Sequence, residues 1–433
     1  MIKIAYVKIW NHDVGVAAWD TDKKFATFEY YPEFLKLGLD IAPVHMPVLP
    51  NSNEIHSFPL LNAETYKGLP GLLADALPDK FGDSIIDAWL ARQGRSSANF
   101  TPVERLCYTG SRGMGALEFY PIENKTINKI VSVEVKELVS LAQEMMVSRE
   151  KLNTSMSGDN KQKQEALQDI IRVGTSAGGA RPKAIIAMNK EGKILSGQSD
   201  VPKGYEHYLL KFDGVNDIEL GAPAGYGRIE IAYYKMASDA GIDMMESRLL
   251  KENGRAHFMT KRFDRIGNDK LHLQSLCGIA HYDFNQAGMY SYEQAFSVMR
   301  QLNLTQAEIS QQYTRMVFNI IARNQDDHTK NIAFLMDKEG KWSLSPAYDV
   351  TYAHDPKSKW VDQHQMTVNG KRREFKREDL IAVAKAQGIK NHEAIIKKVS
   401  EAVSKWKHYA KAAGVKDSRI TEIADSHRNH LLK

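Results

Sequence analysis

Cysteine is scarce in this sequence, and its scarcity excludes two kinds of stabilising site. The 433 residues contain only Cys107 and Cys277, which lie far apart and have no CxxC partner. Neither a disulfide framework nor a zinc cluster can be built from them, which fits a reducing compartment. The chain also opens without the features of a signal peptide, and no segment reaches the roughly 18 uncharged apolar residues of a membrane span. We therefore expect a cytoplasmic protein with no membrane contact.

Familiar ligand-binding motifs are missing as well. The sequence has no GxxxxGK[ST], no GxGxxG and no HExxH segment, and nothing in it indicates a helix-turn-helix. Its net charge of +5 is small, so charge alone does not indicate a nucleic-acid partner. Basic clusters at 371–373, 376–377 and 397–398 could face phosphates if they share one surface. The simpler interpretation is that they form solvated helix faces.

The chain is too long for one compact core, because domains usually hold on the order of 100 to 200 residues. Residues 1–20 and 25–31 alternate apolar and polar side chains, which predicts half-buried strands. A helical stripe at 132–149, followed by strand patterns around a glycine-rich turn, predicts a small lobe. Helices are expected from the apolar spacing at 227–241, 291–302, 305–323, 377–387, 391–413 and 417–431.

These patterns divide the chain into three units. Residues 1–122 form a β-rich unit, and residues 123–258 form a small lobe with a glycine-rich loop and one long helix. Strand signals fade past residue 265, so residues 259–433 are expected to form a mainly helical lobe.

The most informative segment is NIIARNQDDHTKNIAFL at 319–335, where a polar turn separates two apolar runs. Burying these polar groups without partners would cost a few kcal/mol each, so we expect the turn at the floor of a cleft. Asp326 and Asn331 are five residues apart, the offset between the catalytic aspartate and a metal-binding asparagine in protein kinases. Asp349 in WSLSPAYDV would supply a further magnesium ligand. The spacing therefore favours phosphoryl transfer, with Asp326 accepting the proton of the attacking hydroxyl.

Two other interpretations of this turn remain open. His328 and Lys330 would steady charge beside a catalytic Asp326, but the same residues also suit a helix cap followed by a polar turn. A metal-dependent hydrolase is the second alternative, although it lacks fixed histidine spacing and leaves the glycine-rich turn unexplained. Its ligands would come from Asp326, Asp327, His328, Asp349, His354 and His364.

A second informative segment is VGTSAGGARPKAII at 173–186, which predicts a strand, a glycine turn and a strand with Lys183. Gly178 and Gly179 would let backbone amides approach a phosphate, although a plain hairpin turn has the same pattern. Lys211 in HYLLKF lies among apolar neighbours and needs an anionic partner. A nucleotide phosphate would serve, and so would Glu230 on the following helix.

Taken together, these segments resemble the HipA family, the kinase toxins of bacterial toxin–antitoxin pairs. The resemblance spans most of the chain in the family's order: GLLADALPDKFG, RGMGALEF, TSAGGARPK, HYLLKF, TKRFDR, NQDDHTKN and LSPAYDV. It implies an α+β, two-lobed, protein-kinase-like fold with an extra β-rich N-terminal subdomain and a mainly helical C-terminal lobe.

The resemblance also implies an ATP- and magnesium-dependent kinase that phosphorylates a protein serine or threonine. An aminoacyl-tRNA synthetase is the best-known target class. The family's base falls on Asp326, its magnesium ligands on Asn331 and Asp349, and its autophosphorylated serine on Ser176. The nucleotide-binding residues expected from the motifs and the resemblance are Ala177, Gly178, Gly179, Ala180, Lys183, Lys211, Thr260, Lys261, Phe263, His328 and Lys330.

Partners follow from the same resemblance. HipA proteins pair with a small helix-turn-helix antitoxin and, through it, with operator DNA. Phosphorylation of Ser176 would add about −1.5 to −2 charges to a loop meant to hold phosphates, so it is expected to expel the loop and silence the enzyme. The alternative is a kinase-like corepressor without catalysis, against which the presence of Asp326, Asn331 and Asp349 argues.

Overall fold

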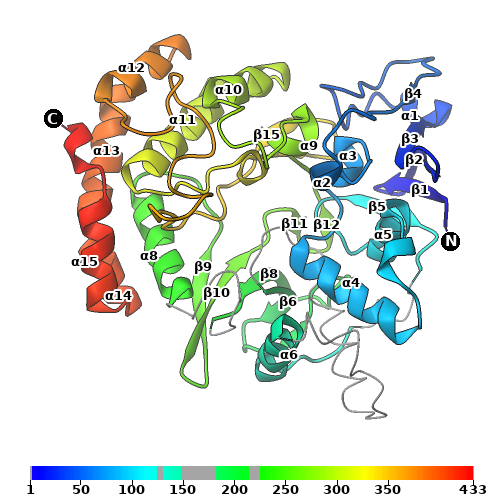
Figure 1. Cartoon of the computed structure of the whole chain (residues 1–433), viewed down its shortest axis with the longest axis horizontal. Helices are drawn as coiled ribbons and strands as arrows, with labels where there is room; N and C mark the ends of the chain where they lie inside the picture. Colours follow the sequence, from blue (N-terminus) through cyan, green and yellow to red (C-terminus); the bar gives the residue numbers. More distant parts are fainter. Residues whose placement is uncertain (1, 124–129, 148–181, 214–224, 433) are drawn as a thin grey trace.

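The computed structural model describes residues 2–123, 130–147, 182–213 and 225–432. Figure 1 shows a β-rich N-terminal unit in blue, a second sheet in cyan to green, and a mainly helical remainder in yellow to red. The domain boundaries expected after residues 122 and 258 stay predictions.

The N-terminal unit is built on an antiparallel sheet with the strand order β4-β3-β2-β1-β5. Ala5, Val7 and Ile9 point into the core and are fully buried, while their neighbours along β1 face outward. This alternation confirms the strands predicted within residues 1–31. The strands are β1 (Ile4–Ile9), β2 (His12–Asp20), β3 (Phe25–Tyr30), β4 (Ile55–His56) and β5 (Leu117–Tyr120).

Short helices cover the buried face of this sheet and lead toward the rest of the molecule. The Asp79 carboxylate accepts the Gly82 N–H at 2.7 Å and so caps the start of α4. Thr101 and Glu104 form a reciprocal capping box at the start of α5. The helices are α1 (Pro32–Leu35), α2 (Ala63–Tyr66), α3 (Gly71–Ala74), α4 (Lys80–Arg92) and α5 (Pro102–Thr109), with a 3-10 turn at Ser97–Asn99.

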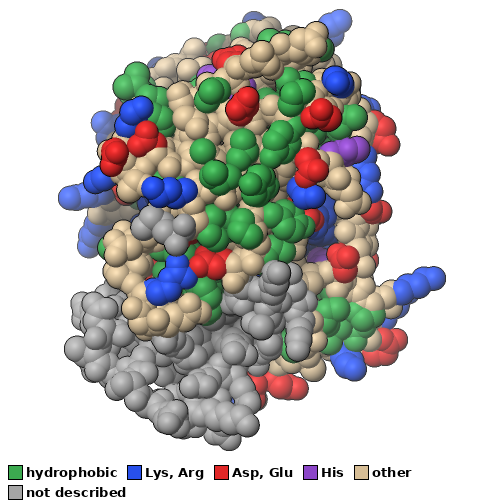
Figure 2. All heavy atoms as spheres, turned by 90° about the vertical axis from the view of Figure 1, so that its right-hand side faces the viewer, with side chains coloured by type: hydrophobic (Ala, Val, Ile, Leu, Met, Phe, Trp, Pro, Cys, Tyr) green, Lys and Arg blue, Asp and Glu red, His purple; other side chains and the backbone are tan. Residues whose placement is uncertain are grey.

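The outer face of the N-terminal unit exposes apolar side chains. Tyr6 is 48% exposed and Ile55 is 60% exposed, and both leave the sheet on the side away from the core. Figure 2 shows hydrophobic side chains gathered on this face of the molecule.

A second antiparallel sheet has the strand order β7-β6-β8-β10-β9. Lys183 begins β6 and Lys211 ends β8, and the two residues are partners across these strands. Both side chains therefore leave the same face of the sheet. The strands are β6 (Lys183–Asn189), β7 (Ile194–Ser196), β8 (Tyr205–Lys211), β9 (Ser247–Glu252) and β10 (Arg255–Lys261).

Two helices pack against this second sheet. The apolar stripe of α6 (Val135–Val147) buries Leu138 and Val139 in one cluster with Ile186 and Leu210, which confirms the stripe expected at 132–149. Helix α8 (Tyr226–Asp239) contacts β9 and β10 on one side and the C-terminal helices on the other. Tyr233 of α8 is fully buried in the large core that α8 shares with the helical lobe.

The rest of the chain is mainly helical, as expected. The expected helix at 391–413 is wrong in one respect, because Lys405 leaves helical geometry and divides it in two. The expected helix at 417–431 stops at Ser426, because His427 adopts an extended ψ of 141°. The helices are α9 (Leu276–Ala280), α10 (Tyr292–Gln301), α11 (Gln306–Ile321), α12 (Arg377–Ala386), α13 (His392–Ser404), α14 (Trp406–Ala413) and α15 (Asp417–Ser426), with a final 3-10 turn at Asn429–Leu432.

The helical region also contains short strands that the fading strand signal past residue 265 did not predict. A three-stranded sheet has the order β13-β14-β15 and frames the polar turn after α11. Its strands are β13 (His272–Ser275), β14 (Ala333–Met336) and β15 (Trp342–Leu344), and β11 (Arg265–Ile266) pairs with β12 (Asp269–Lys270) nearby. Among the described residues, no helix has both the length and the apolar character needed to cross a membrane.

Candidate active site

The polar turn after α11 is held in a defined shape by its own side chains. Arg323 adopts a positive φ of 59° where the helix ends, so the chain turns sharply into residues 324–331. The Asn331 amide nitrogen donates to the backbone carbonyl of Asp326 at 2.7 Å. This bond joins the expected base and the expected metal ligand into one rigid unit.

Asp326 lies at the surface of this turn. Its side chain is 40% exposed, and the His328 Nε2 atom lies 3.7 Å from Oδ1. The same Oδ1 accepts a hydrogen bond from the indole nitrogen of Trp360 at 2.6 Å. The carboxylate is therefore accessible to a substrate and also oriented by a neighbour that the sequence did not indicate.

The adjacent Asp327 has a different role. It is buried and accepts hydrogen bonds from the Tyr292 hydroxyl at 2.9 Å, the Gln365 N–H at 2.8 Å and the His364 Nδ1 at 2.8 Å. Burial acts to raise the pKa of Asp327, but these donors outweigh it and the pKa is lowered. Asp327 is therefore an ionised structural anchor of the turn.

A chain of contacts continues behind this anchor to Arg428, which follows α15. Arg428 donates to His364 Nε2 at 2.9 Å, so His364 carries its proton on Nδ1, where it faces Asp327. Burial lowers the pKa of His364 and keeps the imidazole neutral. Arg428 also donates to the Ile320 carbonyl at 2.7 Å and to Gln325 at 3.1 Å. The last turn of the chain thus supports the candidate active-site turn from behind.

This pairing bears on the alternative of a metal-dependent hydrolase. Two of its expected ligands, Asp327 and His364, are already bonded to each other. Within the part of the chain that the structure describes, no three His, Cys, Asp or Glu side chains are grouped as they would be to hold a metal ion.

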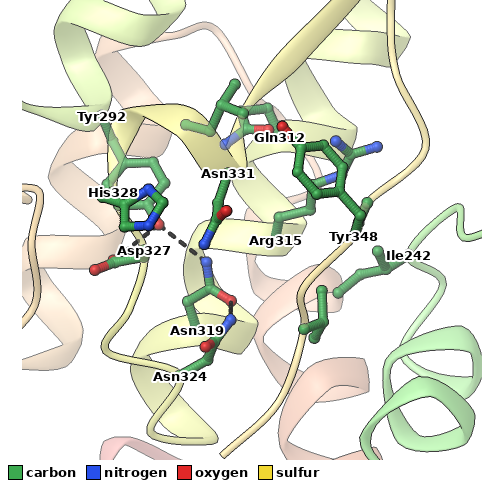
Figure 3. Close-up of a pocket in the computed structure, with 13 residues that line it drawn as sticks. Ile242, Tyr292, Gln312, Arg315, Asn319, Asn324, Asp327, His328, Asn331 and Tyr348 are labelled. Carbon is green, nitrogen blue, oxygen red and sulfur yellow. Dashed lines mark hydrogen bonds between the residues drawn. The ribbon is translucent and has the colours of Figure 1, made fainter. Parts of the chain in front are cut away.

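A polar pocket lies behind the turn, between α11 and the segment that carries Asp349 (Figure 3). Its lining is rich in charged and amide side chains, unlike the mainly apolar lining typical of sites for flat organic ligands. We therefore do not assign it to adenine. The polar lining residues are Tyr292, Gln312, Arg315, Asn319, Asn324, Asp327, His328, Asn331 and Tyr348.

Lys211 connects the second sheet to the helical lobe. Its ammonium group lies 2.5 Å from the Glu230 carboxylate of α8 and also contacts the carboxylate of Asp349. Burial alone would lower the pKa of Lys211, but the two carboxylates outweigh burial and raise it. The ion pair with Glu230 that the sequence left as an alternative is therefore present, together with a second partner.

Asp349 occupies an unusual backbone position. Its φ is 52°, in the left-handed region that residues with a side chain rarely adopt, and such strain gathers at functional sites. Burial acts to raise its pKa, but Lys211 and then Lys183 outweigh burial, so the pKa is lowered. The ionised carboxylate is therefore the stable form of this expected metal ligand.

Lys183 has a different partner. Its ammonium group lies 3.1 Å from Asp79 of the N-terminal unit, and both side chains are buried. Burial raises the pKa of Asp79, and the attraction of Lys183 compensates only in part. The N-terminal unit thus reaches the same end of the second sheet as Asp349.

The expected nucleotide-binding residues Thr260, Lys261 and Phe263 are ordered by contacts within the fold. The Thr260 hydroxyl accepts a hydrogen bond from Ser247, and Lys261 forms an ion pair with Glu206. The Lys261 N–H donates to the Glu246 carbonyl at 3.0 Å, so that group is engaged within the fold. The ring of Phe263 lies against Tyr348, with 5.4 Å between centroids, and so contacts the residue before Asp349.

Lys330 is held by an aromatic neighbour. Its ammonium group stands over the Phe284 ring, 4.9 Å from the centroid. Its charge also acts on the pKa of Asp75 and Asp79, which places it near the N-terminal unit. The glycine-rich loop falls outside the described residues, and with it Ser176, Ala177, Gly178, Gly179 and Ala180.

The basic clusters near the end of the chain are largely matched by acidic neighbours. Lys371 contacts Asp379 at 2.8 Å, Arg377 contacts Glu393, and Lys397 lies 3.9 Å from Glu401. These pairs favour solvated helix faces over a phosphate-binding surface.

The residues present suit a magnesium ion bound with nucleotide phosphates. Asp349 offers a carboxylate and Asn331 an amide oxygen, which are hard ligands of the kind that Mg²⁺ prefers. The Asn331 amide nitrogen is fixed by its bond to Asp326, which leaves the oxygen as the ligand atom. Two protein oxygens are enough, because phosphates and water complete such sites.

Comparison with known protein families settles which family this arrangement represents. The model of the HipA-like C-terminal domain matches residues 175–407, and the model of the HipA N-terminal domain matches residues 5–120. The chain belongs to the HipA family. The HipA resemblance carried by the sequence motifs is thereby confirmed.

Individual relatives are distant. "Putative kinase Y4mE" of Sinorhizobium fredii is 23% identical over 126 residues, which cover 27% of this chain and 30% of that protein. The match thus spans less than a third of the relative. A chain of the solved Shewanella oneidensis complex of HipA, HipB and operator DNA aligns over 99% of this chain and 96% of its own length. Its TM-score is 0.66 at 15% identity, which confirms the two-lobed HipA fold.

Proposed function

We propose that this HipA-family chain is an ATP- and magnesium-dependent kinase that transfers the γ-phosphate to a protein serine or threonine. The observation that carries the proposal is the contact of Lys211 with both Glu230 and Asp349. In protein kinases, a lysine on the third strand of the small lobe pairs with a glutamate on the next helix, and a later aspartate binds magnesium. Among the described strands of its sheet, Lys211 lies on the third in chain order, and Glu230 lies on the next described helix.

Each side chain of the candidate site has a separate role in the proposed phosphate transfer. Asp326 accepts the proton of the attacking hydroxyl, which its exposed position permits. Lys211 and Lys183 lie on one sheet face, where two neighbouring ammonium groups would attract the phosphates of a nucleotide. Asp349 and Asn331 hold Mg²⁺, which neutralises phosphate charge when it is bound. Asp327 keeps the turn in place.

Ser176 belongs to the proposal as a regulatory site. Its phosphorylation would add charge to the glycine-rich loop and so oppose nucleotide binding. The kinase would then silence itself once it had used ATP on its own chain.

Partners are proposed on the same basis. The solved Shewanella oneidensis complex contains HipA, HipB and operator DNA, and the fold of one of its chains matches nearly the whole of this chain. We propose that this chain acts as a toxin, that a helix-turn-helix antitoxin neutralises it, that the pair binds operator DNA, and that the target is a protein such as an aminoacyl-tRNA synthetase.

The test is the intact mass of the dephosphorylated protein before and after incubation with Mg·ATP. The expected result is a gain of one phosphate that maps to Ser176 and is absent in Asp326→Ala. Asp269→Ala serves as a matched control, because the Asp269 side chain is 69% exposed and its ion pair is with the surface residue Lys338. If no sample gains phosphate, the kinase proposal fails and a corepressor without catalysis becomes the better interpretation.

A further inference from the structure

The indole of Trp360 makes a direct contact with the candidate base. Its Nε1 atom donates to Asp326 Oδ1 at 2.6 Å, a short distance for an N–H donor and a carboxylate. Trp360 lies 34 residues along the chain, in the irregular segment that follows Asp349. No motif in the sequence marks it.

The backbone around Trp360 is held firmly beside the turn. The Trp360 N–H donates to the Ser358 hydroxyl at 3.1 Å, and its carbonyl accepts from the Gln365 side chain. Gln325, the residue before Asp326, donates its side-chain amide to the Val361 carbonyl at 3.0 Å and its backbone N–H to the Ala353 carbonyl at 3.0 Å. The indole is therefore presented to Asp326 from a fixed support.

The ring itself is fixed by aromatic neighbours. The Trp360 ring lies 6.2 Å from His328 and 6.5 Å from Phe284, centroid to centroid, in edge contacts. Such arrangements are favourable for aromatic pairs and restrict the rotamer. Position and direction of the N–H donor are thus both set before a substrate arrives.

An indole nitrogen can donate a hydrogen bond but cannot accept a proton. Trp360 therefore does not compete with Asp326 for the proton of the acceptor hydroxyl. It engages Oδ1, while the carboxylate remains 40% exposed and the second oxygen is available to the substrate.

We propose that Trp360 is a positioning residue that holds Oδ1 of Asp326 and turns Oδ2 toward the acceptor hydroxyl. The inference rests on the proposed kinase function, because it assigns Asp326 as the base. It adds a residue that acts through the base, to which its indole is hydrogen-bonded. A hydroxyl must approach the base within hydrogen-bond reach and in line with the phosphate, so a freely rotating carboxylate would reduce the reactive fraction.

The experiment uses Trp360→Phe, which keeps an aromatic ring and removes the N–H donor. The first-order rate of phosphate gain by the dephosphorylated full chain is measured at saturating Mg·ATP, together with the ATP concentration that gives half the maximal rate. We expect the rate to fall about 10- to 100-fold, the range for losing one hydrogen bond to a charged group. The half-saturating ATP concentration should change less than about twofold, because uniform ATP binding is untouched.

Trp342→Phe is the matched control. Its indole also donates one hydrogen bond, to the Asp40 carbonyl at 3.1 Å, in the contact between β15 and the N-terminal unit rather than to a candidate site residue. It should leave the rate within about twofold of the wild type. Thermal unfolding of both variants reports whether each one folds.

A double-mutant cycle separates positioning from a structural role. In an Asp326→Ala background, incubated much longer so that slow residual phosphate gain becomes measurable, adding Trp360→Phe should change the residual rate less than about twofold, because the two residues act as one unit. An equal loss in both backgrounds would overturn the proposal, and so would a faster Trp360→Phe enzyme, since the indole would then be blocking the base. If Asp326→Ala keeps the wild-type rate, the base assignment itself fails. If Asp326→Ala is inactive while Trp360→Phe is unaffected, only the role of Trp360 fails.

Discussion

Lys183 and Lys211 lie opposite each other on neighbouring strands, yet different parts of the molecule neutralise them. Lys183 faces Asp79 of the N-terminal unit, whereas Lys211 faces Glu230 of α8 and Asp349 of the helical lobe. The pKa of Asp79 is raised by burial in spite of its lysine, and the pKa of Asp349 is lowered because two lysines outweigh burial. The fold therefore favours the ionised form of Asp349, which is the form that could bind Mg²⁺, and disfavours the ionised form of Asp79.

The largest effect is expected at Asp349. Replacing it with Asn removes the carboxylate that pairs with Lys211 and would hold Mg²⁺. We expect the rate of phosphate gain from Mg·ATP to fall about a hundredfold to a thousandfold, as when a preorganised charge-stabilising group is lost. Asp269→Asn, on the surface, should be unaffected. A wild-type rate in Asp349→Asn would remove the basis for treating the two lysine sites differently.

Replacing each lysine should affect a different kinetic parameter. Lys211→Met is expected to lower the maximal rate about a hundredfold, because the lysine–glutamate pair is required for the reactive arrangement. Lys183→Met should mainly raise the half-saturating ATP concentration, by about tenfold, because its proposed contribution to the reaction is to attract the phosphates of the nucleotide. Kinetics over a range of ATP concentrations distinguish the two patterns. Identical kinetic profiles would contradict the comparison.

Acid should lower the stability of the fold by protonating buried histidines rather than by breaking the ion pairs of Lys211. Burial lowers the pKa of His272 to about 4, and an unfolded imidazole titrates near about 6.5. Between these values the unfolded chain binds more protons than the folded chain, so stability falls as pH drops, by up to about 1.4 kcal/mol per pH unit. Urea unfolding at several pH values measures this slope, and His272→Gln should reduce it. An unchanged slope would mean that other groups control acid stability.

The smallest effect is expected at Asp79. Burial raises the pKa of Asp79, so its ionised form is less favourable in the folded than in the unfolded protein, in spite of the attraction of Lys183. Asn at this position would keep both the helix cap and an acceptor for Lys183. Asp79→Asn should therefore destabilise the fold less than Asp349→Asn does, although it removes the carboxylate beside the buried Lys183 ammonium. Asp349→Asn should cost about 1.5 to 3 kcal/mol, since its ionised form is favoured. Urea unfolding compares the two, and a reversed order would contradict the assignment of charges.

Local features of the fold were predictable, and long-range contacts were not. The strands at residues 4–30 and most helices follow from side-chain periodicity, which local sequence sets directly. The contact between Asp326 and Asn331 follows from a fixed spacing inside one turn. By contrast, Asp79 and Lys183 are 104 residues apart, and Trp360 and Asp326 are 34 apart, so only the folded chain brings them together.

Other differences have physical causes as well. The strands β13 to β15 hold three or four residues each, too few for an alternating pattern to stand out. The break at Lys405 lies in a sequence with no proline or glycine, so tertiary packing rather than local propensity ends α13 there. The contact of Lys330 with Phe284 was likewise not predictable, because the two residues lie far apart in the sequence.

Arg428 links the segment after α15 to the turn that carries the candidate base Asp326. Its guanidinium bonds Ile320, Gln325 and His364, and His364 in turn fixes Asp327 beside the candidate base. A variant truncated after α14 would retain every candidate site residue and still lose this support. We expect such a variant to lose the phosphate gain that the proposal predicts for the full chain, although no candidate site residue has been removed.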